Sequence, residues 1–167
     1  MTAREKVKSP EELQEICRSA QRQGRRVVFT NGCFDILHVG HVRYLESARG
    51  LGDLLIVGVN SDSSVKQIKG PDRPLIGEDQ RAELVAALHC VDYATLFDAP
   101  DPLKLIELIS PDILVKGADW PLEKIIGGDI VMKKGGSVVR IPFVQGSSTT
   151  TIIDRILTRF SKRTSPE

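Results

Sequence analysis

The sequence predicts an α/β domain built on a five-stranded, mainly parallel sheet with helices on both faces. Three observations lead to this prediction. Short apolar runs alternate along the chain with longer segments of helical periodicity, which is the pattern of repeated β-α-β units. The apolar runs lack a polar side, as expected of strands that are buried on both faces in a parallel sheet. A length of 167 residues suits one domain with one full core.

Local signals place each element in the first half of the chain. Ser9 and Pro10 open a helix, because serine caps well and proline suits the first helical position, and Gly24 ends it. Two apolar runs then predict strands, and two periodic segments predict helices with an apolar side toward the core. In chain order these are a strand at 27–30, a helix at 39–50 with Val42, Leu45 and Ala48 inward, a strand at 54–59, and a helix at 78–90 with Leu84, Val85 and Leu88 inward.

A polar stretch at 61–78, between the second strand and the helix at 78–90, lacks a core face and is predicted to be a loop and a candidate lid over the site. The second half of the chain then repeats the alternation of strands and helices. Its predicted elements are strands at 93–97, 113–115 and 138–143, a helix at 103–109, one or two short helices within 121–134, and a terminal helix at 148–160 with Ile152, Ile153, Ile156 and Leu157 inward. We therefore divide the chain into an N-terminal helix at 1–24, one domain at 25–160 and a frayed polar tail at 161–167.

Composition argues against several classes of protein. Lys and Arg number 23 and Asp and Glu number 22, so a general nucleic-acid coat protein, which needs excess cations, is disfavoured. No apolar run approaches the ~20 residues of a membrane span, and no apolar segment of a secretion signal follows the start. Cys17, Cys33 and Cys90 are too scattered for a disulfide framework or paired metal knuckles. We expect a cytoplasmic protein with reduced thiols that binds neither nucleic acid nor membrane.

The densest cluster of chemically active residue types runs from Asn31 to His41, directly after the first predicted strand. Open α/β sheets bind ligands at the carboxyl ends of their strands. A helix is predicted to begin in this segment, and a helix N-terminus offers free N–H groups and a positive dipole end to phosphate. His38 and His41 lie three residues apart and share a helical face, and Gly40 lets a phosphate approach the backbone closely. The segment therefore predicts a phosphate-binding site.

Other interpretations of this segment are weaker. Two histidines at this spacing suit a metal pair, but no third ligand lies nearby, so we expect no metal site. A helix surface without function is disfavoured, because two of the three histidines lie in one glycine-rich turn. Cys33 is interpreted as a small buried filler, since no base partner is near. The glycine spacings of dinucleotide-binding folds and P-loops are missing here, which disfavours a dehydrogenase or a kinase.

The run GCFDILHVGH resembles the HxGH motif of the cytidylyltransferase-like nucleotidyltransferases, a superfamily with a Rossmann-like α/β fold. Further segments fall, in order, where that family carries its substrate motifs: Asn60-Ser61-Asp62, Lys66, Lys69, Arg73-Pro74, Arg81, Val115-Lys116-Gly117 with Asp119-Trp120, and Gly146 to Thr150. The resemblance spans residues 25–157. HxGH alone is moderately specific, whereas the ordered set is highly specific.

Within that superfamily, the sequence is most similar to the D-glycero-β-D-manno-heptose 1-phosphate adenylyltransferases. The runs VGVNSD, LVKGADW and GSVVRIPFVQGSSTTTIIDRI carry this likeness. Glycerol-3-phosphate cytidylyltransferases commonly have an Arg before a Glu-Gly-Ile-Ser-Thr-Thr motif, whereas Phe143-Val144-Gln145 precede Gly146 here. In some bacteria the adenylyltransferase is fused to a sugar-kinase domain; this chain has no room for one, so a stand-alone form is expected.

The resemblance implies transfer of AMP from ATP to the heptose 1-phosphate, giving ADP-heptose and pyrophosphate, with Mg²⁺ accompanying ATP and a homo-oligomer, a dimer or larger. It implies catalytic roles for His38, His41 and Lys69. The implied nucleotide-binding residues are Asn31, Gly32, Cys33, Phe34, His38, Gly40, His41, Lys116, Gly117, Asp119, Ser148, Thr149 and Thr150. The implied sugar-phosphate-binding residues are Asp35, Asn60, Asp62, Lys66, Arg73 and Arg81.

Several of these assignments have competing interpretations. A solvated face would explain any single cation, but four cations between Lys66 and Arg81 favour an anion site. Asp35 suits a sugar hydroxyl or Mg²⁺ as well as it suits a helix cap. Residues 148–150 can cap the last helix and bind phosphates at the same time. Trp120 is a candidate stacking surface for adenine, although partial burial is the simpler interpretation.

Two rival functions stay open. The first keeps the chemistry and changes the substrates, giving a cytidylyltransferase that acts on glycerol 3-phosphate or a related alcohol phosphate. The second is a non-catalytic nucleotide-binding protein that keeps the fold. The intact trio of His38, Gly40 and His41 argues against the second, because a decayed site would normally lose one of them.

Overall fold

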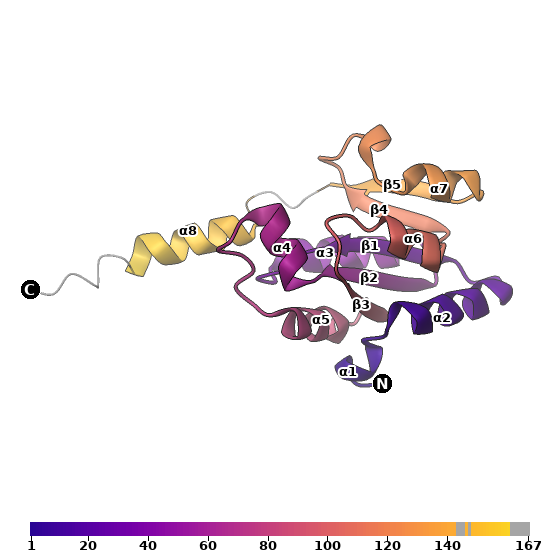
Figure 1. Cartoon of the computed structure of the whole chain (residues 1–167), viewed down its shortest axis with the longest axis horizontal. Coiled ribbons are helices and arrows are strands. Elements are labelled where there is room, and N and C mark those ends of the chain that lie inside the picture. Colours follow the sequence, from indigo (N-terminus) through magenta and orange to yellow (C-terminus); the bar gives the residue numbers. More distant parts are fainter. Residues whose placement is uncertain (143–145, 147, 161–167) are drawn as a thin grey trace, which may run out of the picture.

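The computed structural model describes residues 1–142, 146 and 148–160. Its centre is a five-stranded sheet in the order β3-β2-β1-β4-β5, with every neighbouring pair parallel (Figure 1). The strands are β1 (Val27–Gly32), β2 (Leu54–Asn60), β3 (Tyr93–Phe97), β4 (Ile113–Gly117) and β5 (Ser137–Ile141). The expected α/β fold is confirmed, and the described strands are wholly parallel.

The strand order creates a crevice at one edge of the sheet. From β1 the chain moves outward through β2 to β3, then crosses back so that β4 lies on the other side of β1. The connections after β1 and after β4 therefore diverge at their carboxyl ends. This is the position where open α/β sheets bind ligands.

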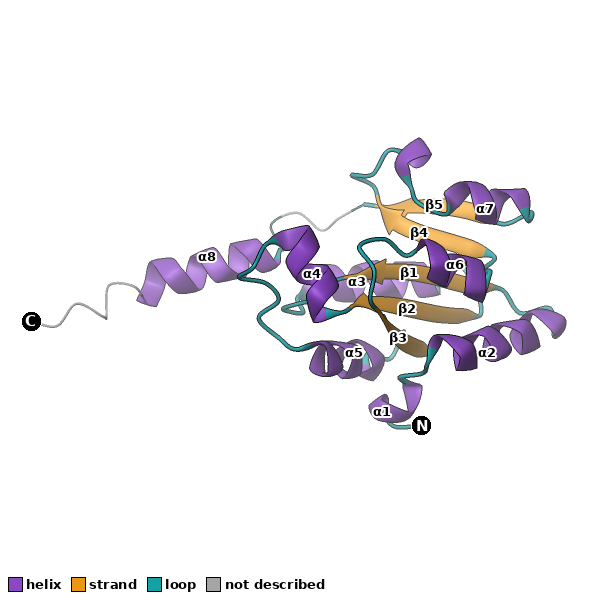
Figure 2. Cartoon of the chain, in the orientation of Figure 1, coloured by secondary structure: helices purple, strands orange, loops and turns teal. Residues whose placement is uncertain are grey.

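Helices cover both faces of the sheet (Figure 2). One core cluster packs α3 (Val39–Arg49) and α5 (Glu78–Ala87) against the sheet, and the other packs α2 (Pro10–Arg22), α6 (Leu103–Ile109) and α7 (Gly128–Lys133). The remaining helices are α1 (Ala3–Lys6), α4 (Asp62–Lys69), a 3₁₀ turn η1 (Leu122–Lys124) and α8 (Thr149–Phe160). Within the described ranges, no helix is long and apolar enough to cross a membrane.

The helix α2 begins and ends where its sequence signals predict. The Ser9 hydroxyl accepts a hydrogen bond from the Glu12 N–H, and the Glu12 carboxylate accepts one from the Ser9 N–H, at 3.2 and 2.8 Å. Pro10 is the first helical residue, as predicted. Gly24 follows the helix with a φ of +74°, a conformation that glycine adopts without strain.

Three expectations about the helices were wrong. Residues 61–78 are not one loop, because α4 occupies 62–69, capped by the Ser61 hydroxyl, with Val65 fully buried. Leu84 is 44% exposed, because α5 turns Arg81, Ala82, Val85 and Ala86 toward the core instead. The terminal helix α8 buries none of its residues: Ile156 is 50% and Leu157 60% exposed.

The last strand differs from its predicted bounds, and the predicted tail lies outside the described residues. The strand predicted at 138–143 is observed as Ser137–Ile141. Residue 143 and the tail at 161–167 lie outside the described residues. Figure 1 shows α8 extending away from the sheet, with its first turn near the carboxyl ends of the central strands.

Candidate active site

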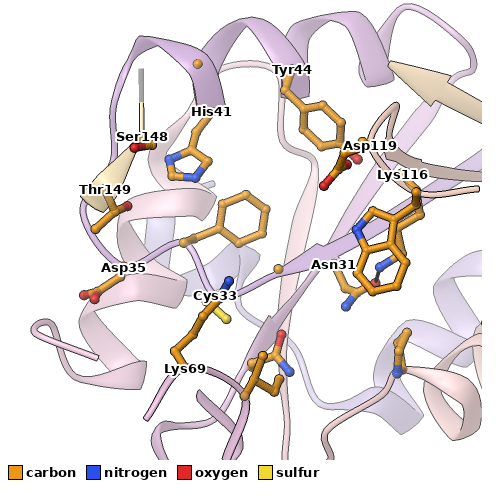
Figure 3. Close-up of a pocket in the computed structure, with 18 of the residues that line it drawn as sticks. Asn31, Cys33, Asp35, His41, Tyr44, Lys69, Lys116, Asp119, Ser148 and Thr149 are labelled. Carbon is orange, nitrogen blue, oxygen red and sulfur yellow. Dashed lines mark hydrogen bonds between the residues drawn. The ribbon is translucent and has the colours of Figure 1, made fainter. Parts of the chain in front are cut away.

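A pocket of about 650 Å³ opens at the carboxyl edge of the sheet. It collects the ends of β1, β2 and β4 together with the first turns of α3 and α8 (Figure 3). Of the residues expected to bind or act, it is lined by Asn31, Gly32, Cys33, Phe34, Asp35, His38, Gly40, His41, Asn60, Lys69, Arg73, Lys116, Gly117, Asp119, Ser148, Thr149 and Thr150. The sheet therefore brings together side chains that are up to 119 positions apart, from Asn31 to Thr150.

The two histidines stack on each other at the start of α3. His38 is the residue before the helix, in extended conformation, and His41 lies in its first turn. Their ring centroids are 3.9 Å apart with an interplanar angle of 23°. Among the described residues, the buried Nδ1 atoms of both rings have no hydrogen-bond partner. A buried polar atom without a partner is costly, so a ligand that bonds to these rings would offset that cost.

Burial keeps both imidazoles neutral. Desolvation lowers the pKa of His38, and desolvation together with the neighbouring His38 lowers the pKa of His41 to about 4. At neutral pH each ring then carries one N–H donor and one acceptor nitrogen. The pair can therefore donate to phosphate oxygens without adding positive charge.

The backbone around the histidines is also arranged for an anion. No side chain caps the start of α3, and Gly40 is buried at that point. The first N–H groups of the helix are thus available to a phosphate in the pocket. Phe34, with a φ of +47°, turns the chain after β1, and its ring lies 5.3 Å from that of His41.

A partly buried lysine, Lys116, lines the pocket between β1 and β4. The Lys116 ammonium donates a hydrogen bond to the Asn31 side-chain carbonyl, as Figure 3 places them side by side. Burial lowers the pKa of Lys116 to about 8, while the nearby Asp119 carboxylate opposes that shift. On the same side, the Tyr44 and Thr30 hydroxyls are hydrogen-bonded at 2.8 Å. This corner can offer a cation and polar groups to a bound molecule.

Asp35 is engaged with the loop at residues 70–77. Its carboxylate accepts hydrogen bonds from the N–H groups of Leu75 (2.9 Å) and Ile76 (3.0 Å), and it is ion-paired with Arg73 Nε at 2.6 Å. Desolvation of this buried carboxyl would raise its pKa, but these hydrogen bonds and the Arg73 charge outweigh it and lower the pKa. Asp35 does not cap a helix, so that alternative was wrong.

Arg81 does not face the pocket. Its fully buried guanidinium donates to the backbone carbonyls of Ile76 (2.8 Å), Cys33 and Asn60 (2.7 Å), and to the Asp62 carboxylate at 2.8 Å. The expectation that Arg81 and Asp62 bind sugar phosphate is corrected accordingly: they pair with each other, and neither lines the pocket. A buried arginine must satisfy its five N–H donors internally, and this one bonds to protein acceptors at every nitrogen.

The other expected residues of this region divide between pocket and surface. Lys69 ends α4 at the pocket, whereas Lys66, one turn earlier, is exposed and does not line it. The buried Asn60 amide donates to Ser64 Oγ at 2.8 Å and to the Ala99 carbonyl at 3.3 Å. Burial raises the pKa of Cys33, against the effect of Lys69, Arg81 and Arg73, so this thiol is protonated and unreactive at neutral pH.

The first turn of α8 is capped by its own side chains and also lines the pocket. The Ser148 hydroxyl accepts a hydrogen bond from the Thr151 N–H at 3.0 Å, which is a cap. The Thr149 hydroxyl donates to the Ile36 carbonyl at 3.3 Å, which fixes the start of α8 beside the turn after β1. Ser148, Thr149 and Thr150 all line the pocket, so the N-terminus of a second helix faces the same space as α3.

Comparisons with known proteins agree on one family. A family model described as cytidylyltransferase-like matches residues 29–155, about three quarters of the chain. The chain belongs to the cytidylyltransferase-like family. A solved relative, the lipopolysaccharide core biosynthesis protein from Thermoplasma volcanium, has a TM-score of 0.61 and 31% identity, covering 74% of this chain and 100% of that one.

Curated relatives of this cytidylyltransferase-like chain are longer proteins. The bifunctional protein HldE of Trichlorobacter lovleyi is 56% identical over 93% of this chain, and that of Geobacter sulfurreducens is 51% identical over 94%. The chain spans about a third of the length of these relatives, 32% in both cases. The similarity thus covers nearly all of this domain and one part of theirs.

Sequence reasoning missed part of the pocket wall of this family member. Besides Trp120, which is 49% exposed, the additional lining residues are Tyr44, Ile68, Pro100, Asp101, Pro102, Lys124, Ile125 and Ile126. The group from Pro100 to Pro102 begins three residues after the end of β3 and could have been found from the rule that ligands gather at the carboxyl ends of strands. The group from Lys124 to Ile126 spans the end of η1 and the turn after it, and no sequence pattern indicated that it lines the pocket.

Proposed function

We propose that the chain is a sugar 1-phosphate adenylyltransferase that transfers AMP from ATP to D-glycero-β-D-manno-heptose 1-phosphate, giving ADP-heptose and pyrophosphate. The observation that carries the proposal is the stacked pair of neutral His38 and His41 rings between two helix N-termini in one pocket. Among the described residues, the buried Nδ1 atoms of these rings have no hydrogen-bond partner. Such a site suits phosphate oxygens. The likeness to HldE proteins and to a lipopolysaccharide core biosynthesis protein supports a sugar substrate.

The reaction needs positioning more than proton transfer. A phosphate oxygen of the sugar 1-phosphate attacks the α-phosphorus of ATP, the new P–O bond forms, and the bond to the β-phosphate oxygen breaks. The attacking oxygen is already ionised at neutral pH, so no strong general base is required. The electrons of the broken bond leave with pyrophosphate. Catalysis then consists of alignment of the two substrates and stabilisation of charge on the α-phosphoryl group.

His38 and His41 are the proposed donors to the reacting phosphoryl group. They lie at the N-terminus of α3, where N–H groups add further donors. Ser148, Thr149 and Thr150 are proposed to hold the β- and γ-phosphates at the start of α8. Lys69 and Arg73, which line the pocket from the α4 side, would neutralise the substrate phosphates.

The strand ends are proposed to bind the rest of the nucleotide and the sugar. Asn31, Gly32, Phe34, Lys116, Gly117 and Asp119 form the nucleotide side in this proposal. Asn60 lies at the end of β2, next to α4, and is proposed to border the sugar side. Trp120 is half-exposed at the rim of the pocket, where its indole can cover a base without being part of the core.

Magnesium is proposed to arrive with ATP. Within the described ranges, no group of three or more His, Cys, Asp and Glu residues could hold a metal ion. Mg²⁺ usually binds proteins through one or two carboxylates together with substrate phosphates. Asp101 and Asp119 are the pocket carboxylates outside the Asp35 network, so the pocket fits an ion held mainly by the triphosphate. When bound, the ion would neutralise charge on the triphosphate.

A pyrophosphate-release screen tests the proposal. ATP and CTP are each paired with the heptose 1-phosphate and with glycerol 3-phosphate, and initial rates are compared. Release with ATP and the heptose phosphate above all other pairs is expected. Faster release from CTP with glycerol 3-phosphate would favour the cytidylyltransferase, and nucleotide binding without turnover over a panel of sugar phosphates would favour a binding protein. A cytoplasmic location and a homo-oligomer belong to the same proposal, and sedimentation tests the latter.

A further inference from the structure

Two buried charged side chains, Asp35 and Arg81, both bond to Ile76 in the loop at 70–77. The Ile76 N–H donates to the Asp35 carboxylate at 3.0 Å, and the Ile76 carbonyl accepts from Arg81 Nε at 2.8 Å. Asp35 is 2% exposed and Arg81 is fully buried. The loop is therefore held on both sides of this residue by charge-assisted hydrogen bonds, which are stronger than neutral ones.

The same two side chains also reach the turn that carries the histidines. Asp35 belongs to that turn, three positions before His38, and Arg81 donates to the Cys33 carbonyl in it. Arg81 further bonds to the Asn60 carbonyl at the end of β2. The turn after β1, the end of β2 and the loop at 70–77 are consequently tied into one unit.

The loop depends on these two residues for its position. Within the part of the chain that the structure describes, every hydrogen bond that reaches residues 71–76 from outside 70–77 involves Asp35 or Arg81. Half of the loop is exposed, and Leu75, for example, is 58% exposed. A loop with so few buried contacts has little else to fix it.

The ion pair with Asp35 also orients the guanidinium group of Arg73. Arg73 bonds to Asp35 through Nε, and its terminal nitrogens have no hydrogen-bond partner among the described residues. Arg73 and His38 both line the pocket. An arginine held through Nε keeps its Nη donors in a defined direction, ready for a phosphate.

We propose that Asp35 and Arg81 are positioning residues, which clamp the loop at 70–77 to the histidine turn and thereby fix the position of Arg73 relative to His38 in the pocket. This assignment rests on the proposed function for its catalytic consequence, but the clamp itself is a property of the free protein. Neither residue contacts substrate in this account. Asp35 acts through Arg73 and the loop backbone.

Hydrogen exchange in the free enzyme tests the clamp without any substrate. Asp35→Asn removes the charge and keeps the shape, and exchange of the Leu75 and Ile76 amides should become at least tenfold faster. Asp92→Asn is the matched control. Asp92 also accepts a backbone N–H (Leu55, 2.7 Å) and pairs with an arginine Nε (Arg49, 2.9 Å), but it lies at the other edge of the sheet. Unchanged exchange at residues 75 and 76 in Asp35→Asn would overturn the clamp.

A double-mutant cycle separates positioning from direct contact with substrate. Asp35→Asn and Arg73→Ala should each lower kcat/KM at least tenfold, and the double variant should be little worse than Arg73→Ala, because coupled residues are not additive. If the loss of kcat/KM in the double variant equals the product of the two single losses, Asp35 acts independently of Arg73 and the assignment is overturned. Asp92→Asn should lower the melting temperature without changing kcat/KM. Faster exchange in an enzyme that makes no ADP-heptose would support the clamp and refute the proposed function.

Discussion

His41 is the residue on which the proposed chemistry depends most. Its imidazole is neutral, because burial lowers its pKa to about 4, and it faces the pocket with an unpartnered Nδ1 among the described residues. His41→Ala should lower kcat about a hundredfold, as loss of one donor to a developing negative charge does. His89 is exposed and outside the pocket, so His89→Ala is the matched control and should leave kcat unchanged. Near-normal turnover by His41→Ala would remove the pair from the mechanism.

Lys116 gives the site a predictable pH dependence. Burial lowers its pKa to about 8, so the ammonium is charged below that pH and progressively neutral above it. A neutral amine no longer attracts the triphosphate, and ATP affinity should therefore fall as the pH rises from 7 to 9. Calorimetric titration of ATP binding measures this change. Lys116→Met should bind ATP more weakly at pH 7 and with a flatter pH dependence; the same slope as wild type would assign the titration to another group.

Some residue positions in the site could be predicted from the sequence, whereas the roles of others could not. The shared face of His38 and His41 followed from their spacing, and the pocket positions of Asn31 and Lys116 followed from strand ends. The pocket position of Lys69 was expected only from the family resemblance. The roles of Asp35 and Arg81 did not, because a sequence shows that a residue is charged and not whether its partners lie in the protein or in a ligand. Burial decides that, and only the folded chain shows it.

At the scale of elements, the N-terminus of α8 is the segment with two competing roles. Thr150 lines the pocket, whereas Thr151 lies outside it and bonds to the Ser148 hydroxyl at 2.8 Å. Thr150→Ala should therefore lower kcat/KM with little change in melting temperature, and Thr151→Ala should leave kcat/KM unchanged. Melting and kinetics are measured on one preparation of each variant. Equal kinetics for both variants and wild type would leave the first turn of α8 as structure only.

The elements that sequence reasoning found share a clear signal. Strands such as β2 are continuous apolar runs buried along their whole length, and α2 carries a full set of capping residues. The helix α4 was missed because a single apolar residue, Val65, is fully buried on its inner side. The apolar stripe of α8 was correctly identified as a stripe, but periodicity cannot say whether a surface exists for it to cover, and here none of its residues is buried.

At the scale of the whole molecule, topology accounts for the site. Because all five strands are parallel and the order reverses beside β1, the segments after β1 and β4 open onto one crevice, and α8 begins beside it. This part of the site was predictable, since it follows from placing motifs at carboxyl ends of strands. The pocket wall from Lys124 to Ile126 was not predictable, because it depends on how the chain turns from the end of η1 toward α7.

Competition among the four substrates reports directly on the proposed specificity of the enzyme. ATP, CTP, the heptose 1-phosphate and glycerol 3-phosphate are supplied together at equal concentrations with Mg²⁺, and early products are quantified by mass spectrometry. Product ratios under competition report ratios of kcat/KM, which is the quantity that defines specificity. We expect ADP-heptose to be the dominant product and His41→Ala to suppress it. A dominant CDP-glycerol product, or no nucleotide-sugar product from an enzyme that binds ATP, would contradict this expectation.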